Sequence, residues 1–179
     1  MKKLSLICLL SLSLLSVQCD FLKIDDPKPE LPPITMTGQN TFGAIVNGDI
    51  RVNNDIIQLT AIHQVSNVLN IGGGFRYLKT GIDERISFSI SGEEIKVGVY
   101  NFNSEDNEKR RNFSFANFNQ GCLYDIVFEP DTKFDGKVEI LKLDLVNSII
   151  SGTFEFTISV DGCPDVSIDQ GRFDLKLIN

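Results

Sequence analysis

Apolar and polar residues alternate with a period of two through most of the chain after residue 40. The alternation is regular over residues 85–90, 153–160 and 172–177, and it resumes over 95–99 after a turn at Ser91-Gly92. A period of two is typical of β-strands that bury one face against a core and expose the other to water. No segment has a convincing helical period. The pattern therefore predicts an all-β domain of about eight to ten antiparallel strands, folded as a β-sandwich, with a β-barrel as the alternative.

Three local signals refine this prediction. Asn47-Gly48 lies between apolar runs, and both residue types tolerate a positive φ, so a two-residue hairpin turn is expected there. Gly72-Gly73-Gly74 precedes a further apolar run and is interpreted as a glycine-rich hairpin turn. The apolar phase changes between Ile140 and Leu141, which predicts a β-bulge at that point.

The start of the chain has a different pattern. Lys2 and Lys3 precede an uncharged apolar run, Leu4–Val17, that ends just before Cys19. This order is typical of a secretory signal that is processed at a cysteine. We therefore predict a lipoprotein signal peptide over residues 1–18 and a lipid on the sulfur of Cys19.

Two alternatives for this segment stay open. Ordinary signal-peptidase cleavage after Ser11-Leu12-Ser13 is one of them. An uncleaved transmembrane helix is the other, although the uncharged run of about 14 residues is short of the roughly 20 that a bilayer requires. Lipidation would place the protein at the bacterial outer membrane, on a periplasmic or cell-surface face that the sequence does not determine.

Residues 19–39 have the composition of a spacer. They contain four of the six prolines of the chain, with Asp25, Asp26 and Glu30 among them. Such a segment has no apolar face to bury, and it is typical of an extended linker. We predict a lipid-anchored flexible tether over 19–39, followed by a single β-domain over 40–179.

Charge and composition narrow the function classes. Loss of Lys2 and Lys3 with the signal peptide would take the formal net charge from −7 to −9. An acidic surface of this kind disfavours binding to nucleic acid and to anionic lipid. The chain has 13 phenylalanines and no tryptophan, and β-branched residues occur in every apolar segment, which again favours strands.

Two cysteines remain for the domain. Cys8 would leave with the signal peptide, so Cys122 and Cys163 are a disulfide candidate in an oxidising envelope. Such a bridge would stabilise the domain by roughly 4 kcal/mol in the chain-entropy model. The alternative is two separate buried thiols.

The sequence offers little material for catalysis. His63 is the only histidine, and no G-x-S-x-G stretch accompanies it, which disfavours a serine–histidine site. One histidine and two cysteines that pair with each other make a poor zinc site. We predict no catalytic residues, no metal site and no cofactor, and we interpret His63 as a partly exposed loop or strand residue.

The aromatic residues suggest one binding hypothesis. If the ligand is a glycan, Tyr77, Tyr100 and Tyr124 are expected to be exposed on one face. Alternation puts Tyr100 on the side opposite Val99, which favours an exposed Tyr100. The phenylalanines of residues 113–118 follow one another at strand spacing and are interpreted as core.

Several motifs carry a resemblance to a known family. Leu31–Gly48, LPPITMTGQNTFGAIVNG, resembles the start of an uncharacterised family of Bacteroidetes-type lipoproteins, whose pattern is LPP, then TG-x-NTFG, then V-NG. Ile150–Phe156, ISGTFEF, and Gly171–Asp174, GRFD, resemble C-terminal motifs of that family. The resemblance implies a lipid-anchored, mostly β domain without known catalytic residues. Ala44 stands where the family often has cysteine, which leaves Cys122–Cys163 as the pairing available to this chain.

These observations lead to ranked functional hypotheses. We predict a lipid-anchored envelope or cell-surface lipoprotein that is not an enzyme and whose β module binds a ligand or partner. The alternative is a structural or accessory subunit of an outer-membrane complex, and a hydrolase is less favoured because it needs convergent carboxylates in a cleft. The expected partners are the membrane, through Cys19, and a glycan or protein that the sequence does not specify; nucleic acid is not expected.

Overall fold

The computed structural model describes residues 29–178 except 54, 65–66, 78 and 106–109. The predicted signal peptide, Cys19 and the first part of the predicted tether lie outside the described residues. No helix among the described residues is long and apolar enough to cross a membrane.

The described chain forms eleven strands and one short 3-10 turn, η2. In chain order they are β1 Thr41–Val46, β2 Asp49–Asn53, η2 Ile56–Gln58, β3 Leu59–Gln64, β4 Val68–Tyr77, β5 Ile82–Ser91, β6 Gly98–Asn103, β7 Arg111–Asn117, β8 Cys122–Asp125, β9 Lys133–Asp144, β10 Ile149–Ser159 and β11 Val166–Lys176. Sheet A has the order β2-β1-β11-β10-β9-β6, and sheet B has the order β3-β4-β5-β7-β8. Neighbouring strands within both sheets are antiparallel.

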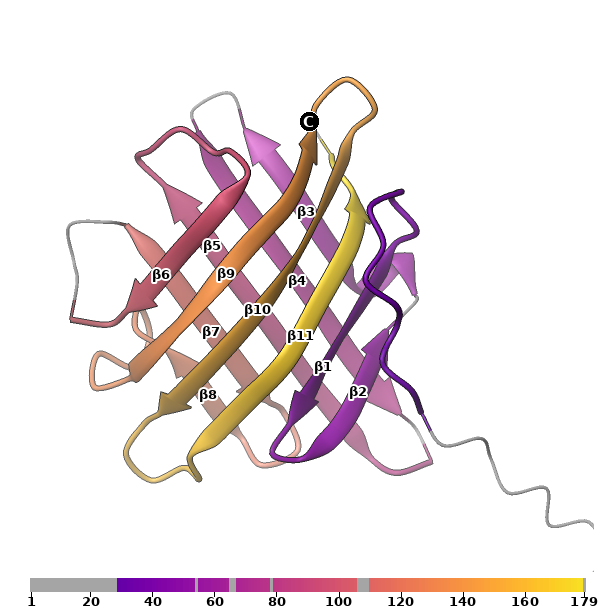
Figure 1. The fold of residues 1–179 in the computed structure, drawn as a ribbon. Coiled ribbons are helices and arrows are strands. Elements are labelled where there is room, and N and C mark those ends of the chain that lie inside the picture. The colour runs from indigo at the N-terminus through magenta and orange to yellow at the C-terminus, as the bar shows by residue number, and fades with distance from the viewer. Residues whose placement is uncertain (1–28, 54, 65–66, 78, 106–109, 179) are drawn as a thin grey trace, which may run out of the picture.

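The two sheets pack face to face, and their strands run in clearly different directions (Figure 1). The prediction of an all-β antiparallel fold is confirmed, with eleven strands rather than the expected eight to ten. An isolated bridge between Ile178, just after β11, and Ile62 of β3 links the sheets at one corner, but the strands form two open sheets, so the alternative of a closed barrel is wrong.

Phenylalanines fill the space between the sheets. Phe113 of β7 stacks on Phe156 of β10 with ring centroids 3.7 Å apart, and Phe88 of β5 lies 5.8 Å from Phe173 of β11. Each contact joins one sheet to the other. The rings come from positions that alternate along the strands, as the period of two predicts.

Two of the local signals are confirmed. Asn47 and Gly48 both have positive φ, 49° and 86°, and they connect β1 to β2 in a two-residue hairpin in which Val46 pairs with Asp49. In the pairing of β9 with β10, Ile140 lies opposite Gly152 and Lys142 opposite Ser151, so Leu141 is the extra residue of a β-bulge.

The interpretation of Gly72-Gly73-Gly74 as a turn is wrong. All three lie in the middle of β4, a buried strand of sheet B. The reason for Gly73 is steric, because a Cβ at this position would overlap the Phe42 ring and lie 2.7 Å from its Cγ. Glycine in this strand therefore marks the close approach of a core ring, not a change of chain direction.

Gly73→Ala is expected to lower the free energy of unfolding by about 1–3 kcal/mol, because the new Cβ forces the ring of Phe42 to move within a filled core. Gly74→Ala is the matched control, since a Cβ there meets nothing nearer than Gln58 Oε1 at 3.6 Å. The control is expected to change stability by less than about 0.5 kcal/mol. Urea unfolding followed by circular dichroism measures both, and equal losses would contradict this placement of the two glycines.

The strand expected over residues 95–99 is also displaced. β6 begins at Gly98, and its buried side chains are Tyr100 and Phe102, whereas Val97 and Val99 are 58% and 56% exposed. Ile95 is buried as the alternation predicts, but the prediction is wrong for Val97 and Val99, because valines at the start of an edge strand can face solvent.

The second half of the predicted tether is folded onto the domain. Pro32 is buried and its carbonyl accepts a hydrogen bond from Arg172 Nη1 at 3.0 Å, while Met36 O accepts one from Lys142 Nζ at 3.1 Å. The prediction of a free tether is therefore wrong for residues 32–39, which pack with the β-domain. Proline-rich composition did not show this, because an extended segment can dock on a sheet as well as cross solvent.

Asp174 of β11 is the main attachment point of this segment. Its buried carboxylate accepts hydrogen bonds from Thr35 Oγ1 at 2.6 Å, Gly38 N at 2.7 Å, Thr37 N at 3.1 Å and Gln39 N at 3.3 Å. Burial acts to raise the pKa of Asp174, but the hydrogen bonds from Thr35 and the three amides outweigh it and hold the pKa below its usual value.

Asp174→Asn is expected to lower the free energy of unfolding at neutral pH by about 1–3 kcal/mol, because backbone donors lose their acceptor. A depressed pKa means that the contribution of the carboxylate is complete above the unfolded-state pKa of about 4 and is lost as the pH falls through the lower folded-state pKa. The stabilities of the wild type and the variant should therefore converge in urea unfolding as the pH falls below the lowered folded-state pKa of Asp174. A difference that stays constant down to that pH would show that the charge of Asp174 is not responsible.

Candidate functional site

The outer face of sheet A is an ordinary charged surface. Lys137 and Glu155 pair there at 2.9 Å with side chains that are 50% and 55% exposed. Such pairs contribute little to stability and are typical of a solvated sheet face.

The outer face of sheet B is different, because small uncharged residues dominate it. We call this surface the serine face. The residues that line it are Thr60, Asn70, Gly72, Gly74, Arg85, Ser87, Ser89, Asn112, Ser114 and Asp125. They come from all five strands of the sheet.

Strand pairing sets these residues in rows. Thr60, Gly72, Ser87, Ser114 and Asp125 are successive partners from β3 to β8, so they form one row across the sheet. At the usual spacing between strands this row is about 19 Å long. A shallow depression of about 280 Å³ lies over it.

Gly74 is buried on this face, and the Gln58 side chain of η2 lies over it. A Cβ at Gly74 would make only ordinary contacts, the nearest at 3.6 Å, and its φ is not positive. Its carbonyl accepts a hydrogen bond from the buried Asn53 side chain, which any residue at position 74 would allow.

Arg85 is the one basic residue lining the depression, and its charge is not balanced locally. Its Nη2 donates to Thr60 Oγ1 at 2.9 Å. Arg51, Arg76 and Arg111 have carboxylate partners, whereas Arg85, like Arg172, has no carboxylate of the described residues within 4.0 Å of its guanidinium. A half-buried cation without a counter-charge in an acidic protein favours an anion from outside.

An apolar border adjoins the serine face. Phe118 is 60% exposed, and its amide donates to Asp83 O at 2.9 Å, so it continues the pairing of β7 with β5. Alternation after Ser114 and Ala116 puts Phe118 on the outer side of the sheet. The interpretation of Phe118 as core is therefore wrong, because the spacing from Phe115 changes by one residue and moves the ring to the other face.

Two other hollows are weaker candidates. One, of about 570 Å³, lies at the end of sheet A, where Asn103 Nδ2 already donates to Asp135 Oδ2 at 3.0 Å. The other, of about 880 Å³, follows the edge strand β2 and borders Pro29, where the described chain begins. We assign no ligand to either.

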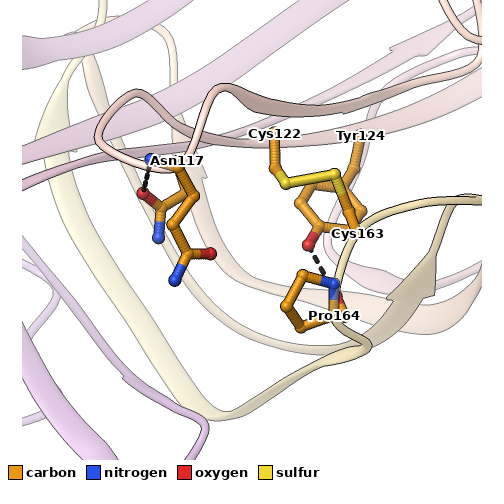
Figure 2. Close-up of a disulfide and its surroundings, with 6 residues drawn as sticks. Asn117, Cys122, Tyr124, Cys163 and Pro164 are labelled. Atoms are coloured by element: carbon orange, nitrogen blue, oxygen red, sulfur yellow. Dashed lines mark hydrogen bonds between the residues drawn. A yellow bond between two sulfur atoms is a disulfide. The ribbon is translucent and has the colours of Figure 1, made fainter.

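The disulfide lies at one end of the sandwich. Cys122 at the start of β8 is bonded to Cys163 in the loop between β10 and β11, so the bond joins sheet B to sheet A (Figure 2). Beside it, Tyr124 Oη donates to Pro164 O at 2.5 Å. Burial, and then the charge of Asp165, raise the pKa of Tyr124, which keeps the hydroxyl protonated as a donor.

A buried ion pair joins the sheets near the same end. Arg51 Nε of β2 lies 2.7 Å from Glu84 Oε2 of β5, and the two side chains are only 10% and 8% exposed. Asn117 Nδ2 also donates to Glu84 Oε1 at 3.3 Å. These groups fix the position of sheet B relative to the β1–β2 hairpin.

The tyrosines do not form a binding face. Tyr100 and Tyr124 are buried, and Tyr77 is half-buried. Tyr77 Oη accepts from Val52 N and donates to Val52 O, both at 2.7 Å, while Tyr100 Oη bonds the backbone of Lys96 in the same way at 2.8 Å. The expectation of a tyrosine platform for a glycan is therefore wrong, because these hydroxyls hold the backbone.

His63 lies in β3 and is partly exposed, as predicted. In the part of the chain that the structure describes, no group of three or more His, Cys, Asp or Glu side chains could hold a metal ion. Cys19 lies outside the described residues.

Fold and surface together define a two-sheet all-β domain whose sheet B has a depression on its outer face that is lined mainly by small polar side chains, with the Arg76–Asp83 ion pair on the same face. The family model described as Domain of unknown function (DUF6252) matches residues 57–174, more than half of the chain, and the chain belongs to this family. The matched stretch contains all five strands of sheet B. No curated protein and no solved structure matches the chain.

Proposed function

We propose that this protein is a lipid-anchored envelope lipoprotein, attached through Cys19, whose β-domain binds a ligand or partner on the serine face without catalysis. The anchor rests on the order of charged, apolar and cysteine residues at the start of the chain. The binding role rests on the contrast between the two outer faces.

The observation that carries the binding role is Arg85 within the half-buried depression of the serine face, where no carboxylate of the described residues lies within 4.0 Å of its guanidinium. Ion pairs such as Lys137–Glu155 on sheet A and Arg76–Asp83 on sheet B suit a solvated face, whereas the depression of the serine face is lined mainly by small polar side chains. Interaction surfaces, in contrast, are depleted of charge toward their centre.

The serines of this face support binding rather than hydrolysis. Ser87 Oγ and Ser114 Oγ lie 2.7 Å apart and hydrogen-bond each other. A nucleophilic serine requires a base within hydrogen-bond reach, and here the partner of each serine is the other serine.

A second candidate function, an accessory subunit of an envelope complex, is favoured by one feature. β8 is an edge strand of sheet B, and it is flanked by the exposed side chains of Leu123, Val127 and Phe128. An exposed apolar edge can add a strand or a packed partner.

Photo-crosslinking in intact cells tests the proposal. A benzophenone amino acid is placed at Ser114 on the serine face, and in a matched variant at Thr157 on the outer face of sheet A. We expect crosslinked product from position 114 and little from position 157, and digestion with proteases or glycosidases identifies its class. Equal yields at both positions, or product only from position 157, would contradict the proposal.

A further inference from the structure

We propose that the serine face takes a carboxylated glycan, with the glycan carboxylate on Arg85 and a sugar ring against Phe118. This inference rests on the proposed binding role of the serine face and adds the chemical class of the ligand.

Charge is the first argument. The guanidinium of Arg85 has five N–H donors, and the described structure uses Nη2 for Thr60. The remaining donors have the fork geometry that binds a carboxylate through two hydrogen bonds. Among the described residues that line the depression the one carboxylate is Asp125, whose Oδ1 accepts from Val127 N at 2.9 Å at the far end of the row. Asp83, two residues before Arg85 on the same face, is paired with Arg76 at 3.0 Å.

The neighbours of Arg85 match hydroxyl groups. Thr60, Ser87 and Ser114 have hydroxyls that both donate and accept, and Asn70 and Asn112 have amides that do the same. Serine loses little side-chain entropy on binding compared with longer polar residues. The cores of protein–protein interfaces are instead rich in aromatic residues, methionine and arginine and poor in serine, so this composition favours a polyhydroxylated ligand.

Phe118 supplies the apolar contact that the tyrosines do not. Arg85 pairs with Ala116, and Phe118 follows two residues later on the same side. Diagonal neighbours on a sheet lie about 7–8 Å apart, so a sugar ring on Phe118 can present a carboxylate to Arg85. The C–H face of a sugar ring packs on an aromatic ring, while its hydroxyls point sideways to polar groups.

The test is a calorimetric titration of the full chain in detergent micelles with polygalacturonate and with hyaluronate. The fully methyl-esterified form of each polymer is the neutral counterpart. We expect the acid forms to bind at least about tenfold more tightly than the esters, because a charge-assisted pair is lost on esterification.

Three variants assign the effect to residues. Arg85→Gln is expected to lose about tenfold in affinity for the acid polymers and to leave the esters unchanged. Phe118→Ser should weaken both forms. Lys137→Gln removes one positive charge from the outer face of sheet A, so it matches the change in net charge, and it is expected to bind like the wild type.

Several results would overturn the inference. These are equal binding of acid and ester, binding of neither acid polymer, unchanged affinity in Arg85→Gln, or an equal loss in Lys137→Gln. If crosslinking from position 114 persists while both acid polymers fail to bind, the glycan class is wrong and the binding surface stands. If the acid polymers do not bind and position 114 gives no crosslinked product, the proposed function is wrong as well.

Discussion

Glu84→Gln is expected to lower the free energy of unfolding by about 3–5 kcal/mol, because it removes the buried carboxylate next to Arg51 Nε and leaves the guanidinium with Asp49, which lies 3.6 Å away and is 76% exposed. The pair is 2.7 Å apart and almost inaccessible to solvent. The exposed Asp49 carboxylate replaces only part of the lost interaction, so most of the cost of burying the Arg51 charge is left uncompensated. Urea unfolding of the purified protein at neutral pH measures the loss.

The exposed pair Lys137–Glu155 provides the control. Glu155→Gln should change stability by less than about 1 kcal/mol, since both side chains remain hydrated. The double variant Arg51→Met/Glu84→Gln should recover part of the loss, because no charge is then buried. A loss below about 1 kcal/mol for Glu84→Gln would contradict a buried pair at this position.

Replacement of both Cys122 and Cys163 by alanine is expected to cost about 4 kcal/mol, because the bond restricts an unfolded-state loop of 41 residues. The bond also joins β8 of sheet B to the loop before β11 of sheet A, so its loss should loosen one end of the sandwich. Comparison of unfolding midpoints for the oxidised wild type, the reduced wild type and the double variant gives the value.

The reduced wild type is the internal control for this change. It should unfold close to the double variant, because both lack the crosslink but keep the rest of the core. If the double variant matched the oxidised wild type within about 1 kcal/mol, the bond would not restrict the unfolded chain as described.

Periodicity predicted the fold class well, for a simple physical reason. A sheet buried on one face imposes a period of two on every strand, so all-β architecture, the Asn47-Gly48 hairpin and the bulge at Leu141 all follow from short-range pattern. The choice of face is a weaker signal. Val97, Val99 and Phe118 are apolar yet exposed, because an edge or a strand end does not require burial.

The candidate site could not be predicted in the same way. Gly72-Gly73-Gly74 looks like a turn in the sequence, and only the ring of Phe42 in the opposite sheet explains why a strand needs glycine at position 73. The unbalanced charge of Arg85 is likewise a property of its neighbours in space. Alternation puts Arg85 on an outer face, but it does not show which residues of the adjacent strands lie beside it, or that none of those described places a carboxylate within 4.0 Å.

The docked segment before β1 gives a physical reason for two of the motifs noted in the sequence, the one that includes Thr35–Gly38 and the one at Gly171–Asp174. Thr35-Met36-Thr37-Gly38 supplies the hydroxyl and amide donors, and Asp174 at the end of Gly171–Asp174 supplies the acceptor. The two stretches are separated by more than a hundred residues and meet at one buried carboxylate. From the sequence alone the first stretch is interpreted as tether and the second as strand, because the pattern along the chain does not show that the two are in contact.

The central claim, a lipid-anchored domain that begins its mature chain at Cys19, is tested most directly by intact mass spectrometry of the protein extracted from membranes. We predict a chain that starts at Cys19, carries a diacylglyceryl group on that residue, and is lighter by two hydrogens for the Cys122–Cys163 bond. A chain that retains residues 1–18, or that starts after Ser13 without a lipid, would contradict the account.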